Sequence, residues 1–255
     1  MSIVKMSDSE YFAIDAVSNS LLSRYAKCPA ATKMKLEPTA AMNKGTCLHS
    51  MVLDGVAEFY NRFSVAPECD RRTKEGKALY AQFLAESEGK IPVSMSDLHD
   101  VVGMATSIAN HPSASELLSS GQSEMAILWD DRDTGAAMKA KADFMTHGIL
   151  IDLKTCQDSS YAVFSKTIVN SGYNVQMALY RDGLRANLFP IERCIIIAVE
   201  NTAPYTCDVY ELDEELLEMG QGQYKRLLRG YLSNVEADVW PAYRYAGIHC
   251  VHAPP

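Results

Sequence analysis

Two carboxylates and an ammonium group flank a short apolar run in the middle of the chain. The run at 148–151 has the length and the branched side chains of a buried strand, and Asp152 and Lys154 follow it directly. Because residues two apart on a strand point to the same face, these two side chains should project together. His147 and Gly148 fit a tight turn, which would fold Asp143 back on the neighbouring antiparallel strand. Burying three such charges is costly unless they bind something, and a divalent cation is the simplest partner.

The remaining patterns predict a mixed α/β chain. Residues 18–20 can cap a helix over 21–27, while 1–17 are expected to be loosely ordered and 54–74 to form a loop with a short strand at 62–67. Periodicity then predicts helices at 42–53, 74–88, 95–111 and 113–118, strands at 124–129, 136–144 and 149–155, helices at 158–169 and 173–188, strands at 194–200 and 205–212, and a helix at 213–231 interrupted at Gly220 and Gly222.

Further polar residues stand at regular spacings on these elements. Gln176 and Tyr180 are four residues apart and share a helix face, and Gly45 and His49 are one helical turn apart. Glu124 opens the alternating strand that precedes Asp143. From the residues alone, Tyr180 is a core aromatic residue, Gln176 is a surface polar residue, and His49 is a core histidine.

The order of these patterns resembles the PD-(D/E)xK nuclease superfamily. Asp143 with the Asp152-Leu153-Lys154 segment resembles the superfamily signature, and the other pairs resemble its QxxxY and GxxxH helices. The likeness is to the branch of exodeoxyribonuclease VIII and lambda-type phage exonuclease, and it runs from about position 11 to 240. It implies a restriction-endonuclease-like α/β core: a central mixed sheet flanked by helices, with a helical N-terminal lobe. We therefore expect one nuclease domain over 1–255, with the lobe at 1–118, the catalytic core at 119–240 and a tail at 241–255.

The signature departs from the common pattern at three positions. Ala142 replaces the proline, Asp152 replaces the glutamate, and Lys141 stands where an arginine is usual. The proline shapes the strand and ligates nothing, so its loss removes no ligand. Lys141 keeps the positive charge but lacks the bidentate geometry of arginine.

The resemblance implies a metal site and a role for each polar residue. Mg²⁺ prefers hard oxygen ligands, which Asp143, Asp152, Glu124 and the backbone carbonyl of Leu153 would supply, with Mn²⁺ as the alternative ion. Lys154 would orient the attacking water or stabilise the developing charge. His49 would reach the site, and Gln176 and Tyr180 would hold Lys154, the water or a phosphate. The plain alternative for Asp152 and Lys154 is a salt bridge on one strand face.

Four residues are expected to contact DNA. Ser20 and Arg24 are four apart on one helix face, and the resemblance places such a serine and basic helix near the DNA end. Lys141 and Thr155 would touch the DNA backbone. The alternative for Ser20 and Arg24 is an ordinary capped surface helix.

Composition narrows the functional class. A net charge of −8 argues against a general nucleic-acid coat protein. The 7 cysteines stand singly, without a CxxC pair, which argues against a zinc ribbon or an iron–sulfur cluster and fits a reducing cytoplasm. No apolar run approaches the length of a membrane span. We therefore expect a cytoplasmic protein of a bacterial host.

The favoured interpretation is a Mg²⁺-dependent exonuclease on double-stranded DNA ends. The resemblance implies 5′-to-3′ degradation that leaves 3′ single strands, a homo-oligomeric ring, and a role in phage-type recombination with a single-strand annealing protein. The alternatives are an endonuclease or helicase-associated nuclease with the same core, or a catalytically silent module that binds DNA or protein.

Overall fold

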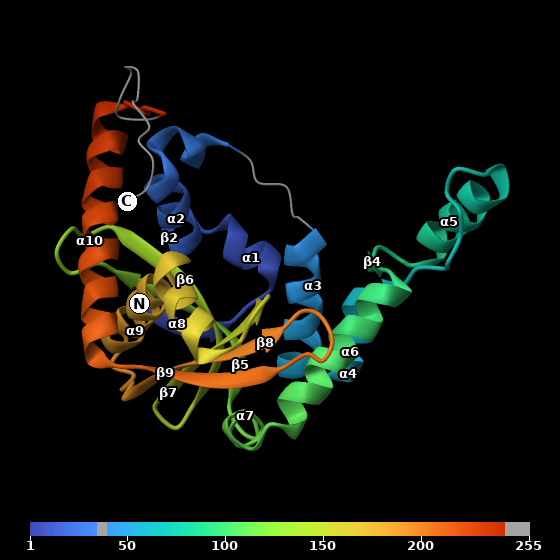
Figure 1. Cartoon of the computed structure of the whole chain (residues 1–255). Coiled ribbons are helices and arrows are strands. Elements are labelled where there is room, and N and C mark those ends of the chain that lie inside the picture. Colours follow the sequence, from blue (N-terminus) through green and yellow to red (C-terminus); the bar gives the residue numbers. More distant parts are fainter. Residues whose placement is uncertain (35–39, 243–255) are drawn as a thin grey trace, which may run out of the picture.

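A central sheet carries the charged residues singled out above. The computed structural model describes residues 1–34 and 40–242, and its mixed α/β architecture confirms the expected fold class (Figure 1). Seven of the described strands form the sheet, with the order β1-β5-β6-β7-β8-β9 and β2 paired beside β6. The β2–β6 and β7–β8 pairs are parallel and the others are antiparallel. The strands are β1 (Ser2–Lys5), β2 (Val17–Ser18), β5 (Gln122–Asp130), β6 (Ala137–Thr146), β7 (Ile149–Cys156), β8 (Arg193–Glu200) and β9 (Cys207–Leu212).

Helices cover both faces of this sheet and enclose two apolar cores. One core lies against α2 (Asn19–Lys27), α8 (Tyr161–Asn170), α9 (Tyr173–Ala186) and α10 (Glu214–Ala237). The other lies against α3 (Ala40–His49), the π-helical turn η2 (Ser50–Asp54), α4 (Val56–Arg62), α6 (Met95–Asn110) and α7 (Pro112–Leu117). Since the sheet is apolar on both faces, its buried strands read as nearly continuous hydrophobic runs, as Ile195–Val199 does.

The predicted hairpin between the two signature strands is present. His147 and Gly148 both have positive φ, 40° and 78°, as a two-residue type I′ turn requires. The β6–β7 ladder pairs Thr146 with Ile149 and ends at Phe144 and Ile151. Beyond this point the two strands diverge, and side chains can occupy the gap between them.

The expectation of a loosely ordered N-terminus is wrong. β1 pairs with β5, and α1 (Asp8–Ala13) begins with a capping box in which Ser7 and Glu10 bond reciprocally. The buried Lys139 ammonium on β6 donates to the carbonyls of Tyr11 (3.0 Å) and Ile14 (2.7 Å). These contacts order the segment, and most come from strands far away in the sequence.

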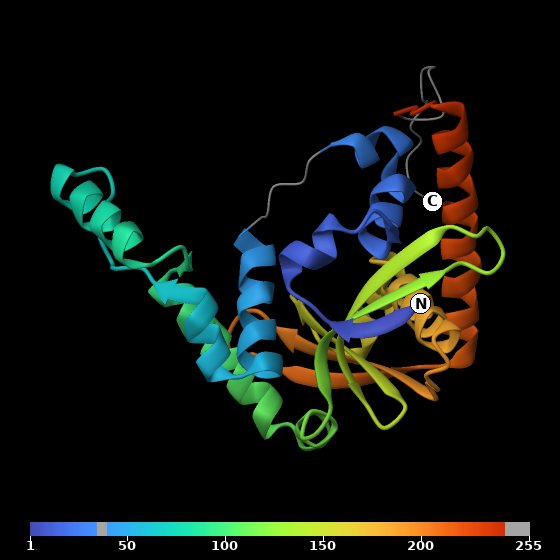
Figure 2. The same cartoon turned by 180° about the vertical axis from the view of Figure 1, so that it is seen from behind.

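The segment at 54–74 also contains more structure than expected. It includes α4, and the short strand β3 (Phe63–Val65) pairs in parallel with β4 (Ile91–Val93). The 3-10 turn η1 (Pro29–Lys33) follows α2, and α5 (Lys74–Glu86) agrees with the predicted helix. In both views α5 projects away from the sheet, on the side opposite α10 (Figures 1 and 2).

The predicted interruption of the last helix is absent. α10 runs through Gly220 and Gly222 and continues to Ala237. Gly220 serves packing, because a Cβ placed there would lie 2.3 Å from the carbonyl oxygen of Asn174 on α9. A Cβ at Gly222 would meet only the Arg226 side chain at 3.7 Å.

Two findings concern the limits of the described chain. From position 243 onward, the predicted tail at 241–255 lies outside the described residues. Within 1–34 and 40–242, no helix combines the length and apolar character needed to cross a membrane.

Candidate active site

The charged residues converge where β6 and β7 separate. They line a cavity of about 890 Å³ bounded by α1, α3, α4 and the ends of β5, β6 and β7. His49, Glu124, Asp143 and Lys154 all face this cavity, although they come from four different elements. The sheet therefore brings together side chains that the sequence keeps far apart.

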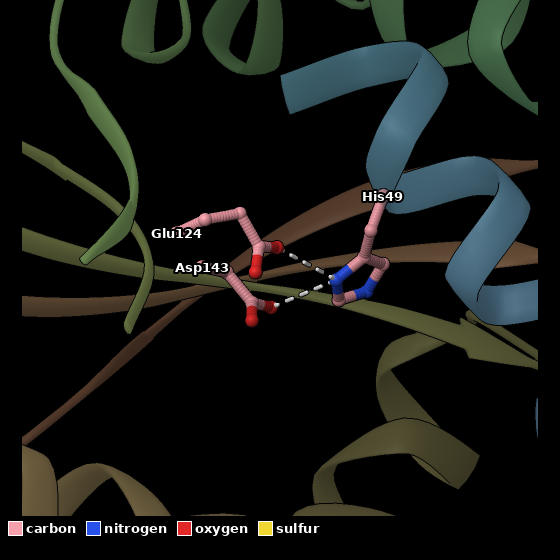
Figure 3. Close-up of side chains that lie close together, drawn as sticks. All are labelled: His49, Glu124 and Asp143. Carbon is pink, nitrogen blue, oxygen red and sulfur yellow. Dashed lines mark ion pairs between the residues drawn. The ribbon is translucent and has the colours of Figure 1, made fainter. Parts of the chain in front are cut away.

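Three of these side chains offer a set of metal ligands. One ligand atom from each of His49, Glu124 and Asp143 lies within 4.8 Å of the other two (Figure 3). The Nδ1 atom of His49 is 3.6 Å from Asp143 Oδ2 and 4.0 Å from Glu124 Oε1. An imidazole nitrogen and two carboxylates are suitable ligands for a divalent cation, so the residues fit the metal that the signature implies.

The tautomer of His49 follows from its second contact. His49 Nε2 is 2.8 Å from the carbonyl oxygen of Leu153. A carbonyl can only accept, so Nε2 carries the proton and Nδ1 faces the carboxylates. The same contact means that the Leu153 carbonyl, predicted as a metal ligand, already accepts a hydrogen bond from His49.

Glu124 reaches the cavity from an unusual backbone conformation. Its φ of 55° lies in the left-handed region although it is a non-glycine residue inside β5. Such a conformation costs about 1–3 kcal/mol and persists where the surroundings impose it, which is most often at functional sites. The strain supports a functional role for this carboxylate.

Asp143 fills the gap left by the diverging strands. Its Oδ2 atom accepts a hydrogen bond from the Leu153 amide at 2.9 Å, in place of a backbone carbonyl. Burial raises the pKa of Asp143 to about 6; the His49 charge opposes this shift and the Asp152 charge adds to it. The carboxyl therefore titrates close to neutral pH when no metal is bound.

Asp152 and Lys154 project together, as predicted from their spacing. Lys154 Nζ is 2.6 Å from Asp152 Oδ2, and Gln176 Nε2 donates to Asp152 Oδ1 at 2.5 Å. Burial lowers the pKa of Lys154, but the Asp152 and Asp143 carboxylates raise it by more, so the net shift is upward. Asp152 thus faces Lys154 and α9 and is not part of the three-residue cluster. Its predicted role as a metal ligand remains a prediction.

Two tyrosines of α9 lie on this side of the site, and Tyr173 lines the cavity. Burial, with the charges of Asp152 and Asp143, raises the pKa of Tyr180 well above its ordinary value, while a hydrogen bond with Gln176 lowers it. The Lys154 ammonium lies 5.0 Å from the centroid of the Tyr173 ring. Tyr173 was not predicted, but it shares the Gln176 face one turn earlier on the helix, and that spacing is readable in the sequence.

The predicted DNA-binding residues divide into two groups. Lys141 and Thr155 line the cavity, and Lys141 Nζ is 2.6 Å from Glu124 Oε2. Ser20 is exposed on α2, and Arg24 on the same helix donates to the Met34 carbonyl at 3.0 Å. Neither lines the cavity, so their role in DNA binding remains a prediction without geometric support.

Sequence reasoning missed several cavity residues from the N-terminal part of the chain, including two on α1 and one on α4. Asp8 and Phe12 on α1 and Arg62 on α4 line the cavity. The sequence Ser7-Asp-Ser-Glu10 is a capping-box pattern that could have revealed α1. No comparable local pattern places Arg62 at the site.

The fold and the arrangement of these side chains are those of the PD-(D/E)xK nuclease superfamily. A family described as "PDDEXK-like domain of unknown function (DUF3799)" matches residues 18–251, and the chain belongs to this family. A comparison with curated proteins gives no match.

One solved structure agrees with this assignment of the fold. A proposed exonuclease from Eubacterium rectale has 16% sequence identity and a TM-score of 0.63, over 90% of this chain and 88% of that chain. An alkaline exonuclease from Laribacter hongkongensis has 17% identity and a TM-score of 0.31, over 63% of this chain and 83% of that chain. At 16% identity the first likeness establishes the shared fold.

Proposed function

We propose that this chain is a divalent-metal-dependent exonuclease that acts on double-stranded DNA ends. The observation that carries the proposal is the joint position of His49, Glu124 and Asp143 in the cavity at the split between β6 and β7, which Lys154 of the Asp152–Lys154 pair also lines. Metal-dependent phosphodiester hydrolysis requires metal ligands and a neighbouring cationic group such as a lysine, and both are present here.

Each residue has a distinct task in this proposal. Mg²⁺ or Mn²⁺ held by His49, Glu124 and Asp143 would supply Lewis acidity and positive charge. Lys154 stays protonated because its pKa is raised, so it can donate hydrogen bonds to the attacking water or to the charge that develops on phosphate. Gln176 fixes the Asp152 carboxylate, and Asp152 in turn fixes Lys154.

The polarity and the biological role extend the proposal further. We infer degradation from 5′ ends, which leaves 3′ single strands for annealing-type recombination in a bacterial cytoplasm. A single-strand annealing protein is the proposed partner, and a homo-oligomeric ring around the duplex is the proposed assembly. Light scattering of the purified chain, with and without duplex, tests the ring.

A nuclease assay tests the activity. Linear duplex labelled at either the 5′ or the 3′ end is incubated beside circular duplex, in Mg²⁺, Mn²⁺ or EDTA. The exonuclease proposal expects metal-dependent loss of linear duplex, early release of the 5′ label, and intact circles. Cleaved circles would instead identify an endonuclease, and full binding without any cleavage would identify a silent module.

Asp152→Ala provides the inactive variant for this assay. It should abolish cleavage and leave DNA binding intact, because Asp152 lies at the convergence of the strands. Asp133→Ala is a matched control, since Asp133 also pairs with a lysine, Lys225 at 2.8 Å, but on a surface turn. Equal activity of the two variants would contradict the site assignment.

A further inference from the structure

A chain of ion pairs leads away from the candidate metal ligands. Lys141 Nζ lies between Glu124 Oε2 at 2.6 Å and Asp8 Oδ1 at 2.7 Å. The other oxygen of Asp8, Oδ2, accepts a hydrogen bond from Arg62 Nη2 at 2.9 Å. One carboxylate therefore bridges two cations, and one of these cations also touches a proposed metal ligand.

The two cations are more firmly held than the anion between them. The side chains of Lys141 and Arg62 are 19% and 29% exposed, whereas that of Asp8 is 45% exposed. Lys141 is carried by β6 inside the sheet, and Arg62 also approaches the partly buried Asp54 at 3.9 Å. Asp8 stands on the six-residue helix α1. Of the three groups, Asp8 is the one that can leave at least cost.

The triad of Asp8, Arg62 and Lys141 is shared by two neighbouring cavities. Asp8, Arg62 and Lys141 line both the cavity that contains the candidate active site and a neighbouring cavity of about 540 Å³. Because both cations line each cavity, an anion bound beside them can contact both. In the metal-free protein the only anion between them, among the described residues, is Asp8.

We propose that Arg62 and Lys141 form a binding site for a backbone phosphate of the DNA strand, and that Asp8 occupies this site until DNA displaces it. The inference rests on the proposed function. A phosphodiester presents two non-bridging oxygens, as the carboxylate presents two, and arginine binds such a pair with its planar fork. Asp8 is thus an internal competitor that DNA must displace from the two cations.

Opposite effects of two substitutions test this inference. Binding of a labelled blunt duplex is measured by anisotropy over a range of salt concentrations, with Ca²⁺ in place of Mg²⁺ to suppress cleavage. Arg62→Gln should weaken binding by about 10-fold and lower the salt slope by about 1, because one phosphate contact is lost. Asp8→Asn should instead strengthen binding by about two- to fivefold, because the competitor has lost its charge.

Two further variants separate this role from a structural one. Arg62→Lys keeps the charge without the fork and should recover part of the affinity. Arg193→Gln breaks a comparable arginine–carboxylate pair, Arg193 with Glu211 at 2.6 Å, at a distance from the site, and should bind like the unmodified chain. Thermal melts confirm that each variant is folded.

The outcomes are distinct. Weaker binding by Asp8→Asn would mean that Asp8 positions the two cations, and it would overturn the inference, as would unchanged binding by Arg62→Gln. If the unmodified chain still cuts linear duplex in either case, the proposed function stands. Failure of the unmodified chain to bind or cut duplex DNA would overturn the proposed function and the inference together.

Discussion

The imidazole of His49 is oriented by the backbone of Leu153, with Nε2 2.8 Å from the carbonyl oxygen. Leu153 lies between the two signature residues on β7, so the strand that carries Asp152 and Lys154 also sets the direction of a helix residue. Because Nε2 donates to this carbonyl, Nδ1 is the ring nitrogen that faces Asp143 and Glu124 (Figure 3). The contact therefore directs Nδ1 of His49 into the cluster of candidate metal ligands.

His49→Ala should weaken metal binding more than it weakens the fold. Loss of an outer-shell partner commonly costs about 10–100-fold in metal affinity, and loss of a ligand should cost at least as much. The hydrogen bond to Leu153 contributes only about 0.5–1.5 kcal/mol to stability. Calorimetric titration with Mn²⁺ and a urea melt measure the two effects. Unchanged metal affinity in a clearly destabilised variant would make His49 a structural residue.

Lys154→Ala should impair catalysis far more than metal binding. An ammonium cannot ligate a cation, and removal of one electrostatic contact to the transition state typically costs about 10²–10³ in rate. Metal affinity should stay the same or rise, since a neighbouring positive charge is removed. Single-turnover cleavage beside calorimetric titration decides this, and joint loss of metal and activity would indicate a purely structural lysine.

Lys154→Ala should be less stable than the unmodified chain when no metal is present. It leaves the buried Asp152 carboxylate without its cation, and breaking a buried pair in this way costs about 3–5 kcal/mol. Adding Asp152→Asn to Lys154→Ala should restore much of the stability, because neither charge is then left alone. Urea melts in EDTA compare the single and double variants. Equal stability of the two would show that the ion pair contributes little.

Asp143 should make the metal-free protein less stable as the pH rises. Burial raises its pKa from 3.8 to about 6, so the folded protein binds the proton more tightly than the unfolded chain does. For this group, stability is therefore greatest below pH 3.8 and falls as the pH rises toward 6, by about 3 kcal/mol in total. Asp143→Asn should be more stable than the unmodified chain at pH 8 in EDTA and similar to it near pH 4.

Metal binding at Asp143 should have the opposite pH dependence to the stability of the metal-free protein. A proton on Asp143 competes with the cation, so metal affinity should rise as the pH increases through about 6. Titration of the unmodified chain with Mn²⁺ between pH 5 and 8 measures the effect. Affinity that does not change over this range would separate Asp143 from the metal site.

The two glycines of α10 should respond in opposite ways to alanine. A Cβ at Gly220 would lie 2.3 Å from the Asn174 carbonyl, so Gly220→Ala should force α9 and α10 apart and cost about 1–3 kcal/mol. Gly222→Ala meets only the Arg226 side chain at 3.7 Å and should stabilise the helix by up to about 1 kcal/mol. Thermal melts of the pair measure this. If both substitutions changed the stability in the same direction, the packing role of Gly220 would be contradicted.

Features that depend on local geometry could be predicted from the sequence alone. The hairpin at His147 and Gly148 follows from turn chemistry, and the shared face of Asp152 and Lys154 follows from the period of a strand. The helix that carries Gln176 and Tyr180 follows from its own periodicity. Each of these depends on residues a few positions apart, whose relative directions the backbone conformation sets.

Which of these groups come into contact depends on the packing of distant segments and could not be predicted from the sequence. The approach of His49 to Leu153, the convergence of Glu124 with Asp143, and the bridge from Arg62 through Asp8 to Lys141 all join segments distant along the chain. Gly220 shows the same limit, because its sequence signal is that of a helix breaker and its actual role is set by Asn174 on another helix. Local propensities fix the conformation of a segment, but the burial of two apolar cores on either side of the sheet fixes which segments come into contact.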